Sequence, residues 1–268
     1  MESRIQELAE LHGGAVRRAE LRRAGISDWS MRQAVAAGVV WHFPGGVYAC
    51  PDAPSWWVRA RLAGADLGCV SAAMKARLWV LNPPRQMHVT ASNNRVRGPF
   101  IQHRSYAKTA LLDSVLQCLR CLPELDALVI AESSVALGKL SLQQLRLAAK
   151  GPRNGNLRRI IAKINPAAES LLETIARYLL ENAGYQVQIQ KYLPGLGRLD
   201  LLVDGVLGIE VDGREYHSSA EAFSEDRRRS NFYVVHGIPT LRVTYHLLVH
   251  QPEEFLRLVQ IAILNCRR

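Results

Sequence analysis

Apolar residues recur at every third or fourth position in three segments near the start of the chain, a spacing that predicts amphipathic helices. The predicted helices cover residues 2–11, 17–23 and 28–37. Ser27 comes directly before the third segment, where a serine is a favoured N-cap. A β-hairpin is predicted next, at residues 39–43 and 47–49. Three helices followed by a hairpin indicate a winged helix-turn-helix, which we assign to residues 1–54.

The outward face of the third predicted helix carries side chains suited to reading DNA bases. Arg32 can bind guanine through two hydrogen bonds, and Gln33 can bind adenine in the same way. The second predicted helix has arginines placed to contact phosphates: Arg17, Arg18, Arg22 and Arg23. We therefore predict a DNA-binding surface made of Arg17, Arg18, Ser27, Trp29, Ser30, Arg32 and Gln33. The alternative is a protein-interaction module or a scaffold, because residues 1–60 hold 7 Lys and Arg against 6 Asp and Glu.

The middle of the chain, residues 55–165, is predicted to be a basic, mixed α/β domain. Helices are predicted at residues 56–67, 71–79, 109–122, 124–136, 141–149 and 155–164, and strands at 87–91 and 99–104. Residues 61–168 hold 16 Lys and Arg against 5 Asp and Glu, which accounts for the chain's net charge of +10. A surface with such an excess attracts phosphate backbones. The alternative is a generally basic protein without a nucleic-acid partner.

Two groups of basic residues in this domain are candidates for following a DNA backbone. The first group lies in and around the loop between the two predicted strands and contains Arg95, Arg97, Arg104 and Lys108. The second group contains Lys150, Arg153, Arg158, Arg159 and Lys163. We expect both groups to bind DNA without reading its sequence.

Near the C-terminus, two short apolar strands flank the turn signal Asp204-Gly205 and carry three acids: Asp200, Glu210 and Asp212. Acids in such strands are costly unless something binds them, such as a metal ion. A two-residue turn would pair Asp200 with Ile209, whereas a three-residue turn would pair Asp200 with Glu210. We predict the three-residue turn, because it gathers the three carboxylates. The alternative is a surface hairpin whose acids face water.

Residues 166–268 contain a set of motifs around these acids. They are Glu169-Ser170, Arg198-Leu-Asp200, Glu210-Val-Asp212-Gly213, His217, Phe223, Asp226-Arg-Arg-Arg229 and Leu241-Arg-Val-Thr-Tyr245. This set resembles the nuclease-like domain related to very-short-patch repair endonucleases, within the restriction-endonuclease-like fold. The resemblance implies an α/β/α domain in which Glu169, Asp200, Glu210, Asp212 and His217 form the catalytic site. It also implies that Asp200, Glu210 and Asp212 hold the metal.

One position departs from the pattern of that superfamily. The usual lysine two residues after the glutamate is replaced by Asp212. A lysine there helps to position water and to stabilise charge, so the departure argues against cleavage more than against metal binding. Arg227 and Arg228, on the helix that follows, are predicted DNA contacts; the alternative is a solvated charged face.

The first part of the chain also resembles a known family. Its motifs are Gly13-Gly14-Ala-Val, Leu21-Arg-Arg-Ala-Gly-Ile-Ser27, Gly38-Val-Val and Gly45-Gly-Val-Tyr48-Ala. They are similar to the N-terminal winged helix of AbiEi-type antitoxins, which are transcriptional autoregulators of type IV toxin–antitoxin systems. The two-part layout also resembles that of some immunity repressors of temperate actinobacteriophages. These resemblances imply a regulator of transcription.

The five cysteines, Cys50, Cys69, Cys118, Cys121 and Cys266, are odd in number and scattered, which argues against a disulfide framework. Cys118 and Cys121 have the spacing of metal ligands, but no second pair accompanies them. We interpret both as small apolar residues on a packed helix. No stretch of the sequence is apolar and long enough to span a membrane, so we expect a cytoplasmic bacterial protein.

The sequence thus predicts an α+β protein with three parts, at residues 1–54, 55–165 and 166–268. We expect a sequence-specific regulator, most simply a repressor, that binds double-stranded DNA as a monomer and needs no cofactor to bind. The first alternative is a Mg²⁺-dependent DNA endonuclease of defence or repair, with His217 or Glu169 accepting a proton. The second alternative is an antitoxin that acts by binding a cognate toxin.

Overall fold

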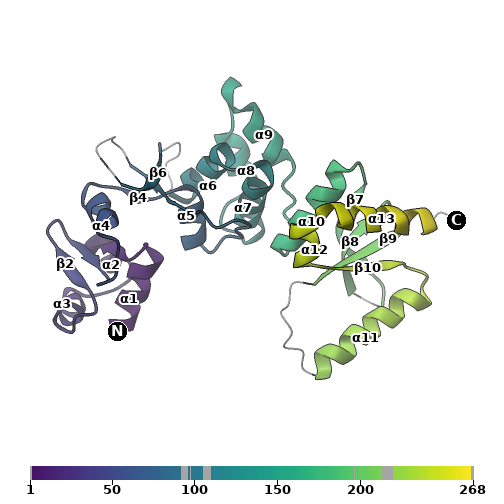
Figure 1. Cartoon of the computed structure of the whole chain (residues 1–268), viewed down its shortest axis with the longest axis horizontal. Coiled ribbons are helices and arrows are strands. Elements are labelled where there is room, and N and C mark those ends of the chain that lie inside the picture. Colours follow the sequence, from purple (N-terminus) through teal and green to yellow (C-terminus); the bar gives the residue numbers. More distant parts are fainter. Residues whose placement is uncertain are drawn as a thin grey trace. The chain divides into compact units, whose positions relative to one another are not determined.

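The computed structural model describes residues 2–91, 96, 98–104, 110–195, 197–212 and 220–266, without the side chains of residues 2 and 220–226. Helices and small sheets alternate along the chain, which confirms the predicted α+β class (Figure 1). The chain divides into two compact units. The first unit consists of Met1–Ala131 and Gln143–Ala162, and the second of Glu132–Leu142 and Lys163–Arg268. The predicted three-part division stays a prediction.

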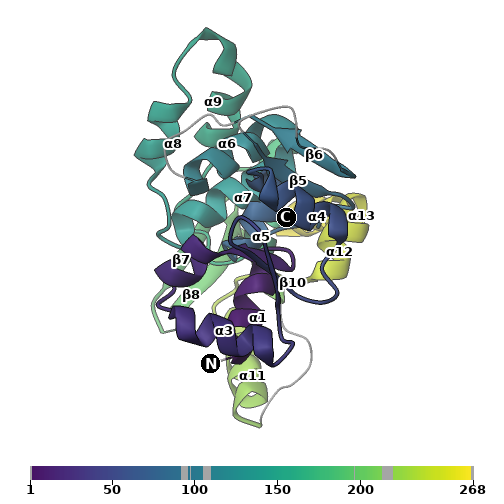
Figure 2. The ribbon, with the colours of Figure 1, turned by 90° about the vertical axis from the view of Figure 1, so that its left-hand side faces the viewer.

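Three helices and a small sheet form the beginning of the first unit. The helices are α1 (Glu2–Leu11), α2 (Arg18–Arg23) and α3 (Asp28–Ala36). The antiparallel sheet has the order β1-β3-β2, with β1 (Ala15–Arg17), β2 (Trp41–Phe43) and β3 (Val47–Ala49). Ile5, Leu21 and Met31 are fully buried and belong to one hydrophobic core, and α1 packs against α3 (Figure 2). The predicted helices and hairpin are present, and the structure adds strand β1.

A second small sheet and six further α-helices follow in the described part of the chain. Its strands are β4 (Asp66–Leu67), β5 (Met87–Thr90) and β6 (Phe100–His103), where β4 pairs antiparallel and β6 pairs parallel to β5. The helices are α4 (Ser55–Leu62), α5 (Cys69–Lys75), α6 (Ala110–Cys121), α7 (Glu124–Ala136), α8 (Leu142–Ala148) and α9 (Gly155–Ala162). The predicted helix 56–67 ends early, at Leu62, because Gly64 adopts a left-handed backbone (φ 96°). Strand β4 then begins at Asp66.

The second unit contains a mixed sheet of the order β10-β9-β8-β7. The strands are β7 (Val187–Leu193), β8 (Gly197–Val203), β9 (Leu207–Asp212) and β10 (Thr240–Thr244), and β10 runs parallel to β9. The helices are α10 (Leu171–Asn182), α11 (Ala220–Val235), α12 (Tyr245–His250) and α13 (Pro252–Cys266). Helices α10, α12 and α13 lie together along the sheet, and α11 lies apart from them (Figure 1). None of the helices in the described part of the chain is long and apolar enough to cross a membrane.

A buried ion pair in the second unit joins segments that are far apart in sequence. The Arg177 guanidinium of α10 lies 2.6 Å from the Glu132 carboxylate, and both side chains are almost completely buried. The Thr174 hydroxyl and the Asn165 backbone N–H also donate to Glu132, at 2.7 and 2.6 Å. Glu132 therefore satisfies three donors and has no access to water.

Candidate nucleic-acid interface and acidic site

Helix α3 presents the side chains that the sequence suggested for reading bases. Ser27 caps the helix, because its Oγ accepts a hydrogen bond of 3.1 Å from the Ser30 N–H. Arg32 and Gln33 are exposed, and the Trp29 side chain is 64% exposed. The prediction that Ser30 faces outward is wrong. Ser30 is only 6% exposed, and its hydroxyl lies 2.9 Å from that of Ser27.

An open pocket of about 650 Å³ separates α3 from the β2–β3 hairpin. Arg18 and Arg32 line it from the helices, and His42 and Tyr48 line it from the hairpin. The His42 and Tyr48 rings lie 4.7 Å apart, and Trp41 at the start of the hairpin is 54% exposed. The hairpin therefore offers aromatic rather than cationic side chains beside the exposed face of α3.

Two predicted phosphate contacts share one internal counterion. Arg18 and Arg22 both form ion pairs with Asp28, the first residue of α3. Hydrogen bonds from Arg18 and then Arg22 hold the pKa of the Asp28 carboxyl well below its usual range. Arg18 and Arg22 together thus contribute a local excess of one positive charge rather than two.

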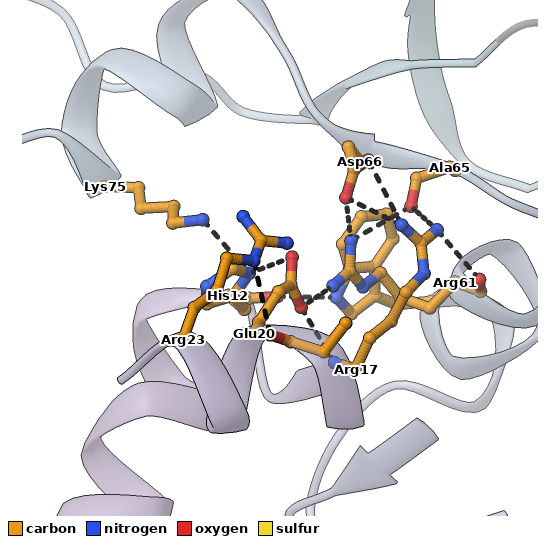
Figure 3. Close-up of polar contacts among 10 residues, drawn as sticks. His12, Arg17, Glu20, Arg23, Arg61, Ala65, Asp66 and Lys75 are labelled. Carbon is orange, nitrogen blue, oxygen red and sulfur yellow. Dashed lines mark hydrogen bonds and ion pairs between the residues drawn. The ribbon is translucent and has the colours of Figure 1, made fainter. Parts of the chain in front are cut away.

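Arg17, in contrast, belongs to a polar network inside the first unit (Figure 3). Its guanidinium lies 3.2 Å from the Asp66 carboxylate and donates to the backbone oxygens of Arg61 and Ala65 at 3.1 and 2.8 Å. The Arg61 side chain is fully buried and pairs with both Glu20 and Asp66. The predicted phosphate contact by Arg17 does not agree with this geometry, because its donors are already satisfied within the protein.

The hairpin of β8 and β9 has the register that the acids suggested. Val203 pairs with Leu207 and Leu201 with Ile209, so the loop is Asp204 to Val206 and the three-residue turn is confirmed. The same register places Asp200 opposite Glu210. Asp204 adopts a left-handed backbone (φ 50°), as does Gly205 (φ 73°), which allows the tight reversal.

The two facing carboxylates have different surroundings. The Asp200 carboxylate accepts a hydrogen bond of 2.8 Å from the Val211 N–H. Burial raises the pKa of Asp200 to about 6, with smaller contributions from the nearby Glu210 and Glu173 carboxylates. The Glu210 carboxylate instead accepts hydrogen bonds from Arg229 and from the Tyr233 hydroxyl, both on α11.

Two further members of the predicted acidic site, Glu169 and Asp212, are more exposed than Asp200 and Glu210. Glu169 is about half exposed and forms an ion pair with Arg198. Asp212 is exposed at the end of β9, where it pairs with Thr244 of β10. His217 lies outside the described residues. In the described part of the chain, the acids Asp200, Glu210 and Asp212 are not among the groups whose ligand atoms are close enough to share one ion.

Glu173 is a buried acid of this region that the sequence did not single out. The backbone N–H of Glu169 and the Gln190 side chain donate to its carboxylate, at 3.1 and 2.9 Å. Its own N–H donates to the N-cap, Ser170, at 3.1 Å. Glu173 thus ties the start of α10 to strand β7 and positions the chain around Glu169.

The structure describes some of the other predicted DNA contacts, whereas others lie outside the described residues. Arg104 is exposed at the end of β6, and Arg227 and Arg228 are exposed on α11. The Arg228 guanidinium donates to the Gly195 oxygen at 3.3 Å. Arg95, Arg97 and Lys108 lie outside the described residues, so their grouping with Arg104 stays a prediction.

A cluster of cysteine and histidine side chains in the first unit was missed by the sequence interpretation. It comprises Cys69, His88, His103 and Cys121, whose ligand atoms all lie within 4.8 Å of one another. Cys118 is buried, as predicted, but Cys121 is exposed and faces this cluster instead of packing as an apolar residue. The signal available in the sequence was the metal-like spacing of Cys118 and Cys121.

No protein-family model matches this sequence, and no curated protein is significantly similar to it.

Proposed function

We propose that this protein is a sequence-specific regulator that binds double-stranded DNA, most simply as a repressor. The observation that carries the proposal is the exposed face of α3, with Arg32 and Gln33 side by side and the β2–β3 hairpin next to it. A helix that offers such side chains can enter the major groove, where arginine and glutamine distinguish base pairs.

The charge of the chain supports the same function. The excess of Lys and Arg lies in residues 61–168, outside the α3 region, and would add affinity without sequence preference. Residues 1–60, which include α3, hold only one more basic residue than acidic residues, and Arg17, Arg18 and Arg22 are paired with acids. In this proposal, base contacts by α3 set the specificity and the basic middle of the chain sets much of the affinity.

The acidic site favours binding over cleavage. A nuclease site needs carboxylates that are free to hold a metal ion. Here the Glu210 carboxylate is engaged by Arg229 and Tyr233, so a cation from the protein occupies the place beside it. A metal ion would have to displace this arginine before it could bind between Glu210 and Asp200.

A metal-dependent endonuclease is the second candidate, and one specific observation favours it. Continued one residue beyond the paired Leu201 and Ile209, the strand register puts Asp200 opposite Glu210, which is an arrangement that can bring two carboxylates to one ion. In this case Mg²⁺ would supply the Lewis acid, and the Asp200–Glu210 pair would hold it.

The test combines binding and cleavage on DNA from the protein's own locus. We expect gel shifts that require a specific sequence, and no nicking of supercoiled DNA with Mg²⁺ or Mn²⁺. Arg32→Ala should weaken specific binding by about 5- to 150-fold and relax the preference at one base pair, as the loss of a bidentate contact does. Arg257→Ala is the matched control, because Arg257 is exposed on α13, outside both α3 and the basic stretch of residues 61–168.

Three outcomes of this test separate the candidates. Unchanged specificity in Arg32→Ala, measured by selection from a random library, would remove α3 from the role of reader. Metal-dependent nicking that disappears in Glu210→Ala would make the protein a nuclease. The absence of both specific shifts and nicking would contradict both functions.

A further inference from the structure

Four elements of the first unit bring one potential metal ligand each to the same place. Cys69 is the first residue of α5, and His88 lies in strand β5. His103 ends strand β6, and Cys121 ends helix α6. Cys69 and His88 are buried, His103 is half-buried, and Cys121 is exposed. The cluster thus joins strands β5 and β6 to helices α5 and α6, with one ligand reaching the surface.

The distances within the cluster are close to those of a tetrahedral site. His88 Nδ1 and His103 Nε2 are 2.9 Å apart, Cys121 Sγ is 4.0 Å from His88 Nδ1, and no pair of ligand atoms exceeds 4.8 Å. Zinc bonds of about 2.3 Å to sulfur and 2.0–2.1 Å to nitrogen give a tetrahedron with edges of about 3.3–3.8 Å. Changes of up to about 1 Å would therefore convert the cluster into such a site.

A second set of contacts fixes the backbone around the cluster. Gln117 is fully buried and lies one helical turn before Cys121 on α6. Its Oε1 accepts from the Cys69 N–H at 2.7 Å, and its Nε2 donates to the Arg104 oxygen at 3.0 Å and to Thr90 Oγ1 at 2.8 Å. One side chain therefore connects all four ligand-bearing segments, as supporting residues do around metal sites.

The backbone also adopts an unfavourable conformation at one residue of the cluster. Cys69 has a left-handed backbone (φ 45°), which costs about 1–2 kcal/mol in a residue other than glycine. A Cβ at the preceding residue, Gly68, would lie 2.3 Å from Thr90 Oγ1 and 2.8 Å from Gln117 Oε1. Strain of this kind is typical of functional sites, where the surroundings hold a residue in position.

We propose that Cys69, His88, His103 and Cys121 bind one Zn²⁺ ion in a structural site. Two thiolates and two imidazoles in a tetrahedron are the preferred ligands of zinc, and four protein ligands leave no position open for catalysis. The site goes beyond DNA binding and does not depend on it.

The chemistry of the thiols fits this assignment. The Cys69 thiol lies within hydrogen-bonding reach of Cys118, His103 and His88. The thiolate is the form that binds a metal. Cys118 itself is buried behind Cys69 and is not one of the four ligands.

The ion would stabilise the β4-β5-β6 sheet, whose strands are short. Strand β4 has two residues and strands β5 and β6 have four each, fewer than the roughly five or six that strands usually have. An ion between β5, β6, α5 and α6 would cross-link the chain from residue 69 to residue 121. It would also tie together β5 and β6, the strands on either side of the segment that contains Arg95 and Arg97 in sequence.

The experiment measures metal in tag-free, full-length protein purified without chelators. We expect about one zinc ion per chain by elemental analysis, as a closed structural site requires. After removal of zinc, Co²⁺ should give the visible absorption of tetrahedral cobalt together with a thiolate charge-transfer band. Cys121→Ser should lose the zinc and the charge-transfer intensity of one thiolate while keeping its helical circular dichroism, because Cys121 is exposed at the end of α6.

Two matched variants and a redox measurement complete the test. Cys118→Ala, which removes the neighbouring thiol, and Cys266→Ser in the second unit should both retain one zinc per chain. The proposal would be overturned if wild-type protein is purified without zinc and also fails to give the spectrum of tetrahedral Co²⁺. Full zinc content in Cys121→Ser would also overturn it. A disulfide between Cys69 and Cys121 or Cys118 in protein purified under reducing conditions would also overturn it.

Discussion

At the scale of single residues, His12 is the clearest case of a side chain whose chemistry is set by its neighbours. It is buried at the end of α1, with its Nδ1 3.1 Å from Lys75 Nζ and 3.3 Å from the Glu20 carboxylate (Figure 3). Burial lowers the pKa of His12 to about 4, and Lys75 and Arg61 also lower it, whereas Glu20 opposes them. The neutral ring can accept a hydrogen bond from Lys75.

This lowered pKa predicts how stability depends on pH. The unfolded chain takes up a proton at His12 near pH 6.5, and the folded protein does so only near pH 4. Stability is therefore lost as the pH falls from about 6.5 to 4, and at pH 5 the loss from His12 is about 2 kcal/mol. Urea unfolding of wild type and His12→Gln at pH 7 and pH 5 measures it, because glutamine does not titrate.

The comparison separates the contribution of His12 to the pH dependence of stability from that of the acids that titrate in the same pH range. We expect the difference between pH 7 and pH 5 to be smaller in His12→Gln than in wild type. His246→Gln is the control, because His246 is exposed on α12 and its loss should leave the difference unchanged. Equal pH dependence in wild type and His12→Gln would show that the ring is protonated in the folded protein.

At the scale of elements, the pairing in the β8–β9 hairpin predicts how a change in loop length affects stability. The loop Asp204 to Val206 sets the pairing of Val203 with Leu207 and hence of Asp200 with Glu210. Deletion of Val206 leaves Asp204-Gly205, a sequence favoured in two-residue turns, and keeps Val203 beside Leu207. We expect this deletion to change the free energy of unfolding by less than about 1 kcal/mol.

Leu207→Ala should have a very different effect, although Leu207 is the neighbour of Val206 in the same hairpin. The Leu207 side chain is fully buried and lies opposite Val203. Its loss costs about 2–5 kcal/mol. Urea unfolding compares the two variants, and equal stabilities would contradict the placement of Leu207 in the paired strand and of Val206 in the loop.

The elements also show what the sequence can and cannot reveal. The sequence pattern predicted α6 and α7 within a residue or two, because both are long and mostly apolar segments. The acids of β8 and β9 predicted their register, since the face and the turn length are linked. Strand β7 was missed although Val187, Ile189 and Leu193 share one face, because polar residues interrupt the pattern.

Contacts between residues far apart in the sequence could not be predicted, for a different reason. The pairing of Arg17 with Asp66 joins residues 49 positions apart, so Arg17 looked like a free cation. The Cys69–His88–His103–Cys121 cluster needs the parallel pairing of β5 with β6 and the packing of α5 on α6. Neither of these contacts follows from local spacing, and the ligands come from four separate elements.

At the scale of the whole molecule, the second unit is made from two separate stretches of the chain. Its short first stretch, Glu132–Leu142, supplies the Glu132 carboxylate to Arg177, Thr174 and Asn165. A boundary chosen from the sequence near residue 165 would separate these partners. Removing one member of a buried ion pair costs about 3–5 kcal/mol, because the other charge stays buried.

Two fragments of the chain should therefore differ in folding. The fragment 163–268 contains the sheet and α10 but lacks Glu132, so Arg177 would lose its buried counterion and keep only the partly exposed Glu181. The fragment 124–268 keeps helix α7 whole and with it Glu132. We expect cooperative thermal unfolding and dispersed amide NMR signals for 124–268 and not for 163–268.

A substitution separates the effect of the carboxylate from that of chain length. Glu132→Gln in the fragment 124–268 keeps α7 and the shape of the side chain but removes the charge. Its unfolding temperature should fall well below that of the unsubstituted fragment, because Arg177 has only the partly exposed Glu181 as a remaining ion-pair partner. If 163–268 folds as stably as 124–268, the buried Glu132–Arg177 pair is dispensable and the second unit begins after residue 162.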